Sequence, residues 1–371
     1  MTQIQQQSNA TRPNDFKLCY RPCLDGVRGL SIIIVVVVHA ALPDIRAGWI
    51  GAPFIGVNTF FVLSGFLITS LLTCEWDIRG DINLKYFYIR RALRLLPALM
   101  MMLVIVTLVS LFVRKPSQKL TVVSDALLPI FYIANWTRAF GLDRPLLFAH
   151  TWSLSIEEQF YAVWPLCLIL LFKNTSSRGS TITWVVLVMF IVIVMRTLMV
   201  VGGVSSERIF NGTDTRADSL LVGCILALAL SNGFLPNSTF SKAAVKVCAW
   251  ISAAVLFALC FRHDFNRAFA QEVFYPLASI SAAAILLEIL TSPKGIMCKL
   301  LSQPWLVFVG KISYGLYLWH APIFMLVFNS GLSRETGLVI SMLATCGATL
   351  SSYYFLERPI LRFKHTFSVI Q

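Results

Sequence analysis

Two residues able to bind an anion and to move a proton lie eleven positions apart in the first apolar stretch, at Arg28 and His39. On a helix, eleven residues turn the chain by about 1100°, roughly 20° beyond three full turns, and advance it by about 16 Å. Both side chains then share one helix face, which suits a long substrate with an anionic head and a distant reactive tip. Alternatively, Arg28 contacts lipid phosphate and His39 hydrogen-bonds inside a packed core. The spacing alone leaves both interpretations open.

A cluster of arginines opens a later apolar stretch, at Arg90, Arg91 and Arg94. Arg91 and Arg94 are three residues apart and Arg90 and Arg94 are four apart, so their side chains meet along one side of a helix. Guanidinium groups placed together bind phosphate through paired hydrogen bonds. The alternative is that the cluster anchors the helix to anionic lipid headgroups at the cytoplasmic surface.

Two adjacent carboxylates, Glu157 and Glu158, lie near the start of another apolar stretch, soon after His150 and Ser153. Ionisable groups inside a bilayer are costly and generally face a cavity or a partner. At a depth similar to that of His39, either carboxylate can orient the imidazole and stabilise its charged form. Pairing with an arginine or contact with interfacial water is the structural alternative.

Further residues form weaker signals. Asp214 and Arg216 lie where an outer loop meets a helix, either in an ion-pair network or against a substrate. Small residues around Ser64 and Gly65 predict close helix packing. The cysteine spacing does not match a zinc site, and we expect no bound metal. One span carries residues typical of a packed core and also of a sugar-binding surface, namely Tyr314, Tyr317, Trp319 and His320.

The composition defines the elements that must position these residues. Hydrophobic residues make up 57% of the 371 residues and charged residues 13%, against roughly 25% charged in soluble domains. The mean hydropathy is +0.74, so the chain is an integral membrane protein; ordinary Gly and Pro contents exclude a disordered or collagen-like chain. The net charge of +13 is explained by Lys- and Arg-rich cytoplasmic loops, so we expect no nucleic-acid partner.

Ten apolar segments approach the length of about 20 residues that a membrane-spanning helix needs. We therefore predict an all-α polytopic bundle with about ten transmembrane helices. Most of the excess Lys and Arg falls on the loops that this count places inside, with both termini cytoplasmic. An eleventh segment, 122–136, is short and contains Asp125 and Pro129, so we interpret it as interfacial or re-entrant. The predicted spans are 26–42, 53–73, 95–113, 152–172, 182–200, 219–232, 244–261, 273–291, 305–328 and 336–356.

The domain organisation is simple. Residues 1–15 are polar and Gln-rich, which predicts a disordered cytoplasmic tail. Residues 16–365 form one membrane domain, and the loops are too short for an appended extracellular hydrolase-like domain. The chemistry is therefore expected among the helices. The formally charged residues within the predicted spans include Glu157, Glu158, Arg196, Glu288 and Lys311.

Six motifs in order, from residue 24 to residue 359, resemble the acyltransferase-three family, whose polytopic membrane proteins O-acylate cell-surface sugars. The motifs cover nearly the whole chain. They are LDGVRG (24–29) followed by His39, FFVLSGF (60–66), RALR (91–94) before Pro97, WSLSIEEQFY (152–161), SYGLYLWH (313–320) and ERP (357–359).

The resemblance implies a donor and an acceptor. The donor is cytoplasmic acyl-CoA, usually acetyl-CoA, used as a co-substrate with no permanently bound cofactor. The acceptor is a hydroxyl of a carbohydrate or glycolipid: lipopolysaccharide, exopolysaccharide, peptidoglycan or lipochitooligosaccharide. The location is the cytoplasmic (inner) membrane of a bacterium, in contact with membrane lipid. Some relatives carry an extracellular domain that completes the transfer, so either this chain transfers the group itself or a separate extracytoplasmic transferase does.

The resemblance also implies residue roles. His39 would remove the proton of a sugar hydroxyl, with a covalent acyl-enzyme as the variant. The resemblance implies that the pair Arg28 and His39 and the pair Arg91 and Arg94 are needed for activity. Helix geometry and the resemblance together suggest His39, Glu157 and Glu158 as catalytic residues and Arg28, Arg91 and Arg94 as ligands of the CoA phosphates. The candidate acceptor contacts, taken from the residues themselves, are Asp214, Arg216, Tyr314, Tyr317, Trp319 and His320.

A transporter that flips a sugar or an anionic lipid is the alternative from another class. It would use the same intramembrane charges as its pathway. The sequence shows no inverted repeat with paired broken helices, the feature that would favour a transporter.

Overall fold

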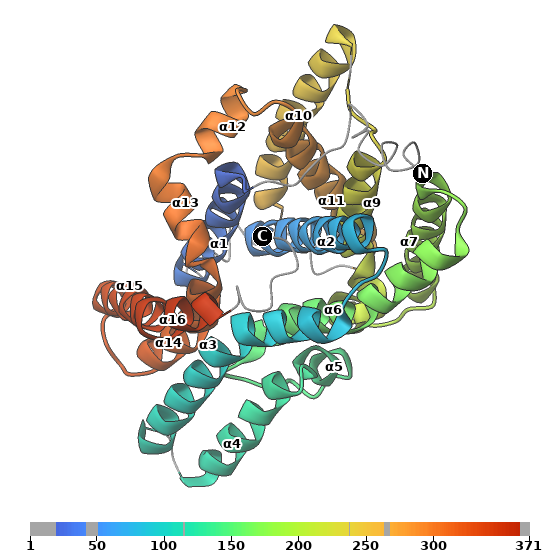
Figure 1. Ribbon diagram of the computed structural model, residues 1–371. Helices are drawn as coiled ribbons and strands as arrows, with labels where there is room; N and C mark the ends of the chain where they lie inside the picture. Colours follow the sequence, from blue (N-terminus) through green and yellow to red (C-terminus); the bar gives the residue numbers. More distant parts are fainter. Residues whose placement is uncertain (1–19, 42–50, 114–115, 237, 263–267, 364–371) are drawn as a thin grey trace.

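The computed structural model describes residues 20–41, 51–113, 116–236, 238–262 and 268–363 (Figure 1). Every regular element within these ranges is a helix, so the all-α prediction is confirmed. The expected tail at 1–15 and both chain ends lie outside the described residues. The helices are α1 (Pro22–Ala41), α2 (Ala52–Arg79), α3 (Leu84–Val113), α4 (Pro116–Ile130), α5 (Ala134–Ala139), η2 (Ala149–Thr151), α6 (Trp152–Asn174), α7 (Arg178–Val201), α8 (Ser206–Asn211), α9 (Thr213–Ser231), α10 (Thr239–Cys260), α11 (Ala268–Thr291), α12 (Ile296–Leu301), α13 (Pro304–Lys311), α14 (Ser313–Phe328), α15 (Arg334–Ser351), η3 (Ser352–Glu357) and α16 (Arg358–Phe363).

Eight helices in the described part are long and apolar enough to cross a membrane, so the chain is a multi-pass membrane protein, but the predicted count of ten is not confirmed. The eight spans are α1, α2, α3, α6 with η2, α7, α10, α11, and α15 continued through η3 and α16. The other two predicted spans are helical but differ in kind. The segment 219–232 belongs to α9, whose first two turns carry three charged residues.

The predicted span 305–328 is broken at Ile312 into α13 and α14. The break leaves α14 with 16 residues, which is short for a full crossing. It also places Lys311, which the sequence analysis put inside a span, at the exposed end of α13. A cation that would be costly in the centre of a bilayer thus lies at a helix end.

Helix α2 occupies the centre of the molecule, with α1, α9 and α11 packed around it (Figure 1). The α2–α9 contact is close because glycines face backbone. A Cβ atom on Gly65 would lie 2.0 Å from the Leu220 carbonyl oxygen, and one on Gly223 would lie 2.0 Å from the Val62 carbonyl oxygen. The predicted packing role of the small residues around Gly65 is therefore confirmed.

Helix α1 is fixed in the same way against α12 and α13. A Cβ atom on Gly26 would lie 1.6 Å from the Leu301 carbonyl oxygen, and one on Gly29 would lie 2.2 Å from the Leu306 carbonyl oxygen. Backbone-to-backbone contact of this kind leaves no room for α1 to shift without separating the helices.

Helices α7 and α10 form the periphery of the bundle. Only 11% of the α7 window and 17% of the α10 window is buried inside the chain. Their large outward side chains are apolar, including Phe190, Leu198 and Phe257. These helices are therefore suited to face lipid.

Helix α4 runs beside α3 at one edge of the molecule (Figure 1). It has 15 residues and is not among the eight candidate spans. Asp125 is buried on α4 and accepts hydrogen bonds from the Arg144 side chain at 2.6 Å and the Leu146 amide at 3.0 Å. This ties α4 to the loop that leads into α6.

Candidate active site

Five charged side chains that are distant in the sequence line one cavity. It has a volume of about 120 Å³ and is bounded by α1, α2, α3, α6 and α14; we call it the arginine cavity. The structure thus brings together the predicted phosphate-binding residues and both predicted carboxylates. They are Arg28, Arg91, Arg94, Glu157 and Glu158.

Both carboxylates of this cavity already have partners. Glu158 accepts a hydrogen bond from Arg91 at 2.5 Å. Glu157 accepts hydrogen bonds from the Tyr161 hydroxyl at 2.7 Å and from Ser64. The Arg91 guanidinium also lies 3.5 Å from the centroid of the Tyr161 ring, a cation–π contact that holds it in place.

The remaining two arginines are freer. Arg28 lies 3.2 Å from Asp25, one turn earlier on α1. Arg94 has no carboxylate within ion-pair distance in the part of the chain that the structure describes. A guanidinium that lines a cavity without a counter-ion is available to an anionic ligand.

A second cavity, of about 650 Å³, is lined by three histidines and we call it the histidine cavity. His39 from α1, His150 from η2 and His320 from α14 converge there. The ring centroids of His39 and His320 are 5.0 Å apart, and those of His150 and His320 are 5.6 Å apart. The volume falls within the range of about 300–1,000 Å³ typical of ligand pockets.

The orientation of His39 differs from the prediction. Its Nδ1 lies 2.7 Å from the Val35 carbonyl oxygen, one turn back on α1. Since a carbonyl only accepts, Nδ1 carries the proton and Nε2 keeps its lone pair. The hydrogen bond expected from Glu157 or Glu158 is absent in the described residues, because those carboxylates bond to side chains of the arginine cavity.

Two residues, Val57 and Tyr317, line both cavities. The Tyr317 hydroxyl lies 2.5 Å from the Ser153 hydroxyl and donates to the His150 carbonyl oxygen at 2.5 Å. The arginine and histidine cavities are therefore neighbours, separated by a fixed tyrosine.

The other predicted acceptor contacts lie in different places: some line one of the two cavities and others line neither. Tyr314 lines the arginine cavity and donates to the Leu95 carbonyl oxygen at 2.9 Å, and His320 lines the histidine cavity. Trp319 is 2% exposed and belongs to the hydrophobic core. Asp214 lines neither cavity and forms a two-pronged ion pair with Arg208, at 2.9 and 2.7 Å.

Arg216 is fully buried and also lies outside both cavity linings. Its guanidinium is 3.7 Å from the centroid of the Tyr275 ring and donates to Asn58 at 2.5 Å. The structure therefore places Arg216 between α2 and α11 as a packed cation.

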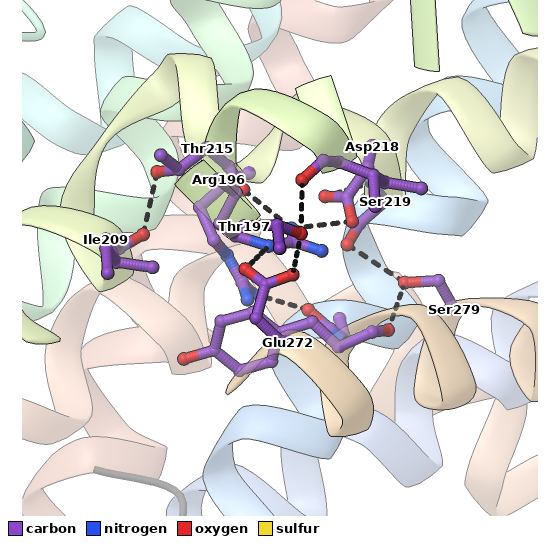
Figure 2. Close-up of polar contacts among 12 residues, drawn as sticks. Arg196, Thr197, Ile209, Thr215, Asp218, Ser219, Glu272 and Ser279 are labelled. Carbon is purple, nitrogen blue, oxygen red and sulfur yellow. Dashed lines mark hydrogen bonds and ion pairs between the residues drawn. The ribbon is translucent and has the colours of Figure 1, made fainter. Parts of the chain in front are cut away.

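A buried network next to Arg216 joins α7, α9 and α11. Figure 2 shows Arg196 between two carboxylates, 2.7 Å from Asp218 and 2.8 Å from Glu272. Arg196 also donates to the Thr215 carbonyl oxygen at 2.8 Å, and Glu272 accepts from Thr197. The sequence analysis left open whether the segment around Asp214 forms an ion-pair network or contacts a substrate. The contacts of the structure are those of an ion-pair network.

Replacing Arg196 by alanine should lower thermal stability in detergent strongly, because it leaves the buried Asp218 carboxylate uncompensated. Loss of one partner of a buried pair costs about 3–5 kcal/mol. Arg208→Ala is the matched control, since the Arg208–Asp214 pair is partly exposed and such pairs contribute about 0–1 kcal/mol. Equal melting temperatures for the two variants would contradict a structural role for Arg196.

Sequence reasoning missed two residues around these cavities. Arg138 of α5 lines the histidine cavity, although the sequence analysis interpreted its neighbourhood as interfacial. Tyr132 lies in the turn before α5 with φ of 52°; burial and the nearby Glu158 carboxylate raise the pKa of its hydroxyl. No periodic pattern marks either residue, because Tyr132 lies in a turn and α5, which carries Arg138, has only six residues.

A known protein family matches the part of the chain that forms both cavities. The model of the acyltransferase domain family matches residues 21–357, which includes every residue of both cavities. The chain belongs to this acyltransferase family. No solved structure matches it significantly.

Two relatives illustrate the acyltransferase family. The peptidoglycan O-acetyltransferase OatA of Listeria monocytogenes is 34% identical over 363 residues, covering 92% of this chain and 56% of the relative. The O-acetyltransferase OatA of Staphylococcus aureus is 34% identical over 353 residues, covering 92% of this chain and 57% of the relative. The chain thus spans little more than half the length of these acyltransferases.

Proposed function

We propose that this acyltransferase is a membrane O-acetyltransferase that moves an acetyl group from acetyl-CoA to a hydroxyl of a cell-wall polysaccharide. The observation that carries the proposal is the pairing of the two cavities along α1. Arg28 lines the arginine cavity and His39, eleven residues further, lines the histidine cavity. The separation along the helix is about 16 Å.

The arginine cavity is the proposed donor site. Arg28, Arg91 and Arg94 present guanidinium groups that bind phosphate in paired geometry. A volume of about 120 Å³ suits the narrow pantetheine arm better than the whole nucleotide. In this arrangement the phosphates stay with the arginines, and the thioester reaches past Tyr317 toward His39.

His39 is the proposed general base. Its Nε2 takes the proton of the acceptor hydroxyl while the hydroxyl oxygen attacks the thioester carbonyl. The carbon–sulfur bond breaks, and the CoA thiolate leaves and recovers the proton from the imidazolium. The Val35 carbonyl, rather than a glutamate, would keep the tautomer correct during this cycle.

The acceptor and the location are inferred from the relatives. One of the two bears peptidoglycan in its name and both are named O-acetyltransferases, which supports a wall polysaccharide over a lipopolysaccharide or exopolysaccharide. The proposed location is the cytoplasmic membrane of a bacterium. A separate extracytoplasmic transferase is the proposed partner if this membrane domain does not complete the transfer.

The test uses membranes that contain the full chain and acetyl-CoA labelled in the acetyl group, with membranes lacking the chain as the control. The expected result is base-labile label in the wall polysaccharide fraction, and none there when the label is in the CoA moiety. Acetyl-CoA that remains unconsumed in the presence of wall polysaccharide and periplasmic extract would contradict the proposal. Movement of a labelled glycolipid across the membrane under those conditions would favour a transporter.

A further inference from the structure

Aromatic rings line the histidine cavity together with its imidazoles. Trp152 and Phe210 lie 4.4 Å apart between centroids, and Phe54 lies 5.0 Å from Phe210. All three line the cavity. A lining that combines flat rings with hydrogen-bonding groups is suited to a sugar ring, whose apolar face packs on aromatic surface.

The charge of this cavity comes from a single residue. Arg138 is the only Lys, Arg, Asp or Glu among the described residues that line it. Its contact with Glu207 is long, at 3.8 Å, and the Glu207 side chain is 63% exposed. Glu207 also accepts a hydrogen bond from Asn211 at 3.0 Å, which anchors it on α8. Arg138 is therefore only weakly neutralised.

Several buried polar atoms of the same cavity have no hydrogen-bond partner among the described residues. They belong to Arg138, His150 and His320, and a buried donor or acceptor left unpaired is destabilising. His150 is 8% exposed and His320 is fully buried. The atoms are Arg138 Nε, His150 Nδ1, His150 Nε2 and His320 Nε2.

We infer that the histidine cavity takes a saccharide with an anionic group, a carboxylate or a phosphate, which Arg138 binds. This rests on the proposed function and narrows its acceptor to acidic sugars. The anion lies against the Arg138 guanidinium, the sugar ring packs on Trp152 and Phe210, and the hydroxyls face the imidazoles that line the cavity. No carboxylate lines the cavity in the described part, and the carboxylate paired with Arg138, that of Glu207, belongs to an exposed side chain at 3.8 Å.

The test is calorimetric binding of three soluble disaccharides to the purified full chain in detergent. The probes share a scaffold and end in a neutral hexose, the corresponding uronic acid, or the hexose phosphate. At least one acidic probe should bind tenfold or more tightly than the neutral one. A preference for the uronic acid identifies a sugar carboxylate as the natural anion, and a preference for the phosphate identifies a phosphorylated or carrier-linked sugar.

Variants of Arg138 test whether this residue causes the preference for acidic probes. Arg138→Ala should remove the discrimination while neutral binding persists, and Arg138→Lys should retain part of it. Arg334→Ala, which removes an exposed cation outside the cavity, should leave it unchanged. Equal affinity for all three probes, or discrimination that survives in Arg138→Ala, would overturn the inference. Binding needs no acyl donor, so it is read independently of whether acetyl transfer occurs.

Discussion

Replacing His39 by alanine is expected to abolish acetyl transfer while the protein still inserts and accumulates. Positioned general bases contribute about 10²- to 10⁴-fold to rate, and the unprotonated Nε2 of His39 faces the histidine cavity. The measurement is ester-linked label in the polysaccharide fraction, normalised to the amount of protein in the membrane. His39→Gln should fail as well, because an amide cannot take up the proton.

Val37→Ala is the control for this variant, because its side chain is 52% exposed on the lipid side of the same helix. It shortens an α1 side chain without reaching either cavity. A His39→Ala enzyme with more than about a tenth of wild-type activity would show that another group removes the proton. His320, whose ring lies 5.0 Å from that of His39, and His150, which lines the same cavity, would be the residues to replace next.

Replacing Arg94 by alanine is expected to raise the KM for acetyl-CoA about ten- to hundredfold with little change in protein stability. A hydrogen bond to a charged group is worth about 1.5–3 kcal/mol, and each 1.4 kcal/mol is about a factor of ten. Arg94 has no carboxylate partner in the described part of the chain, so its removal leaves no buried carboxylate without a partner. The measurement is initial rate against donor concentration.

Arg91→Ala makes an informative contrast, because Arg91 is bonded to the half-buried Glu158. Its loss should lower both the melting temperature and activity, whereas Arg94→Ala should change donor affinity alone. Lys85→Ala is the matched control, since it removes an exposed cation from the same end of α3. An unchanged KM in Arg94→Ala would place the CoA phosphates elsewhere.

The parts of the site predicted well from sequence lie within single helices. The shared face of Arg28 and His39 follows from the helical period alone, and so does the proximity of Arg91 and Arg94 on α3. The membrane helices themselves could be predicted from the sequence, because long apolar runs leave few alternatives to a membrane helix. The structure adds that all four residues line two adjoining cavities.

The parts that escaped prediction depend on contacts between distant segments. Whether Glu158 meets Arg91 or His39 is decided by how α6 packs on α3, and nothing in the local sequence records that choice. Arg196 pairs with carboxylates that are 22 and 76 residues away in the sequence. The sequence therefore could not show whether this charge has a structural role or faces a cavity. The break at Ile312 did leave a local signal, since Gly310, Lys311 and Ser313 interrupt the apolar run, but the apolar residues on both sides favoured one continuous span.

The glycine contacts of α1 have a consequence for donor choice. Gly26 and Gly29 hold α1 against the backbone of α12 and α13, so Arg28 and His39, whose interval is set by the helix itself, also keep fixed positions relative to these neighbours. If the proposed donor is acetyl-CoA, its pantetheine arm must match that interval to engage both ends at once. We therefore expect thioesters truncated on the CoA side to be poor substrates for lack of reach, and selection among acyl groups to depend on the space beyond His39.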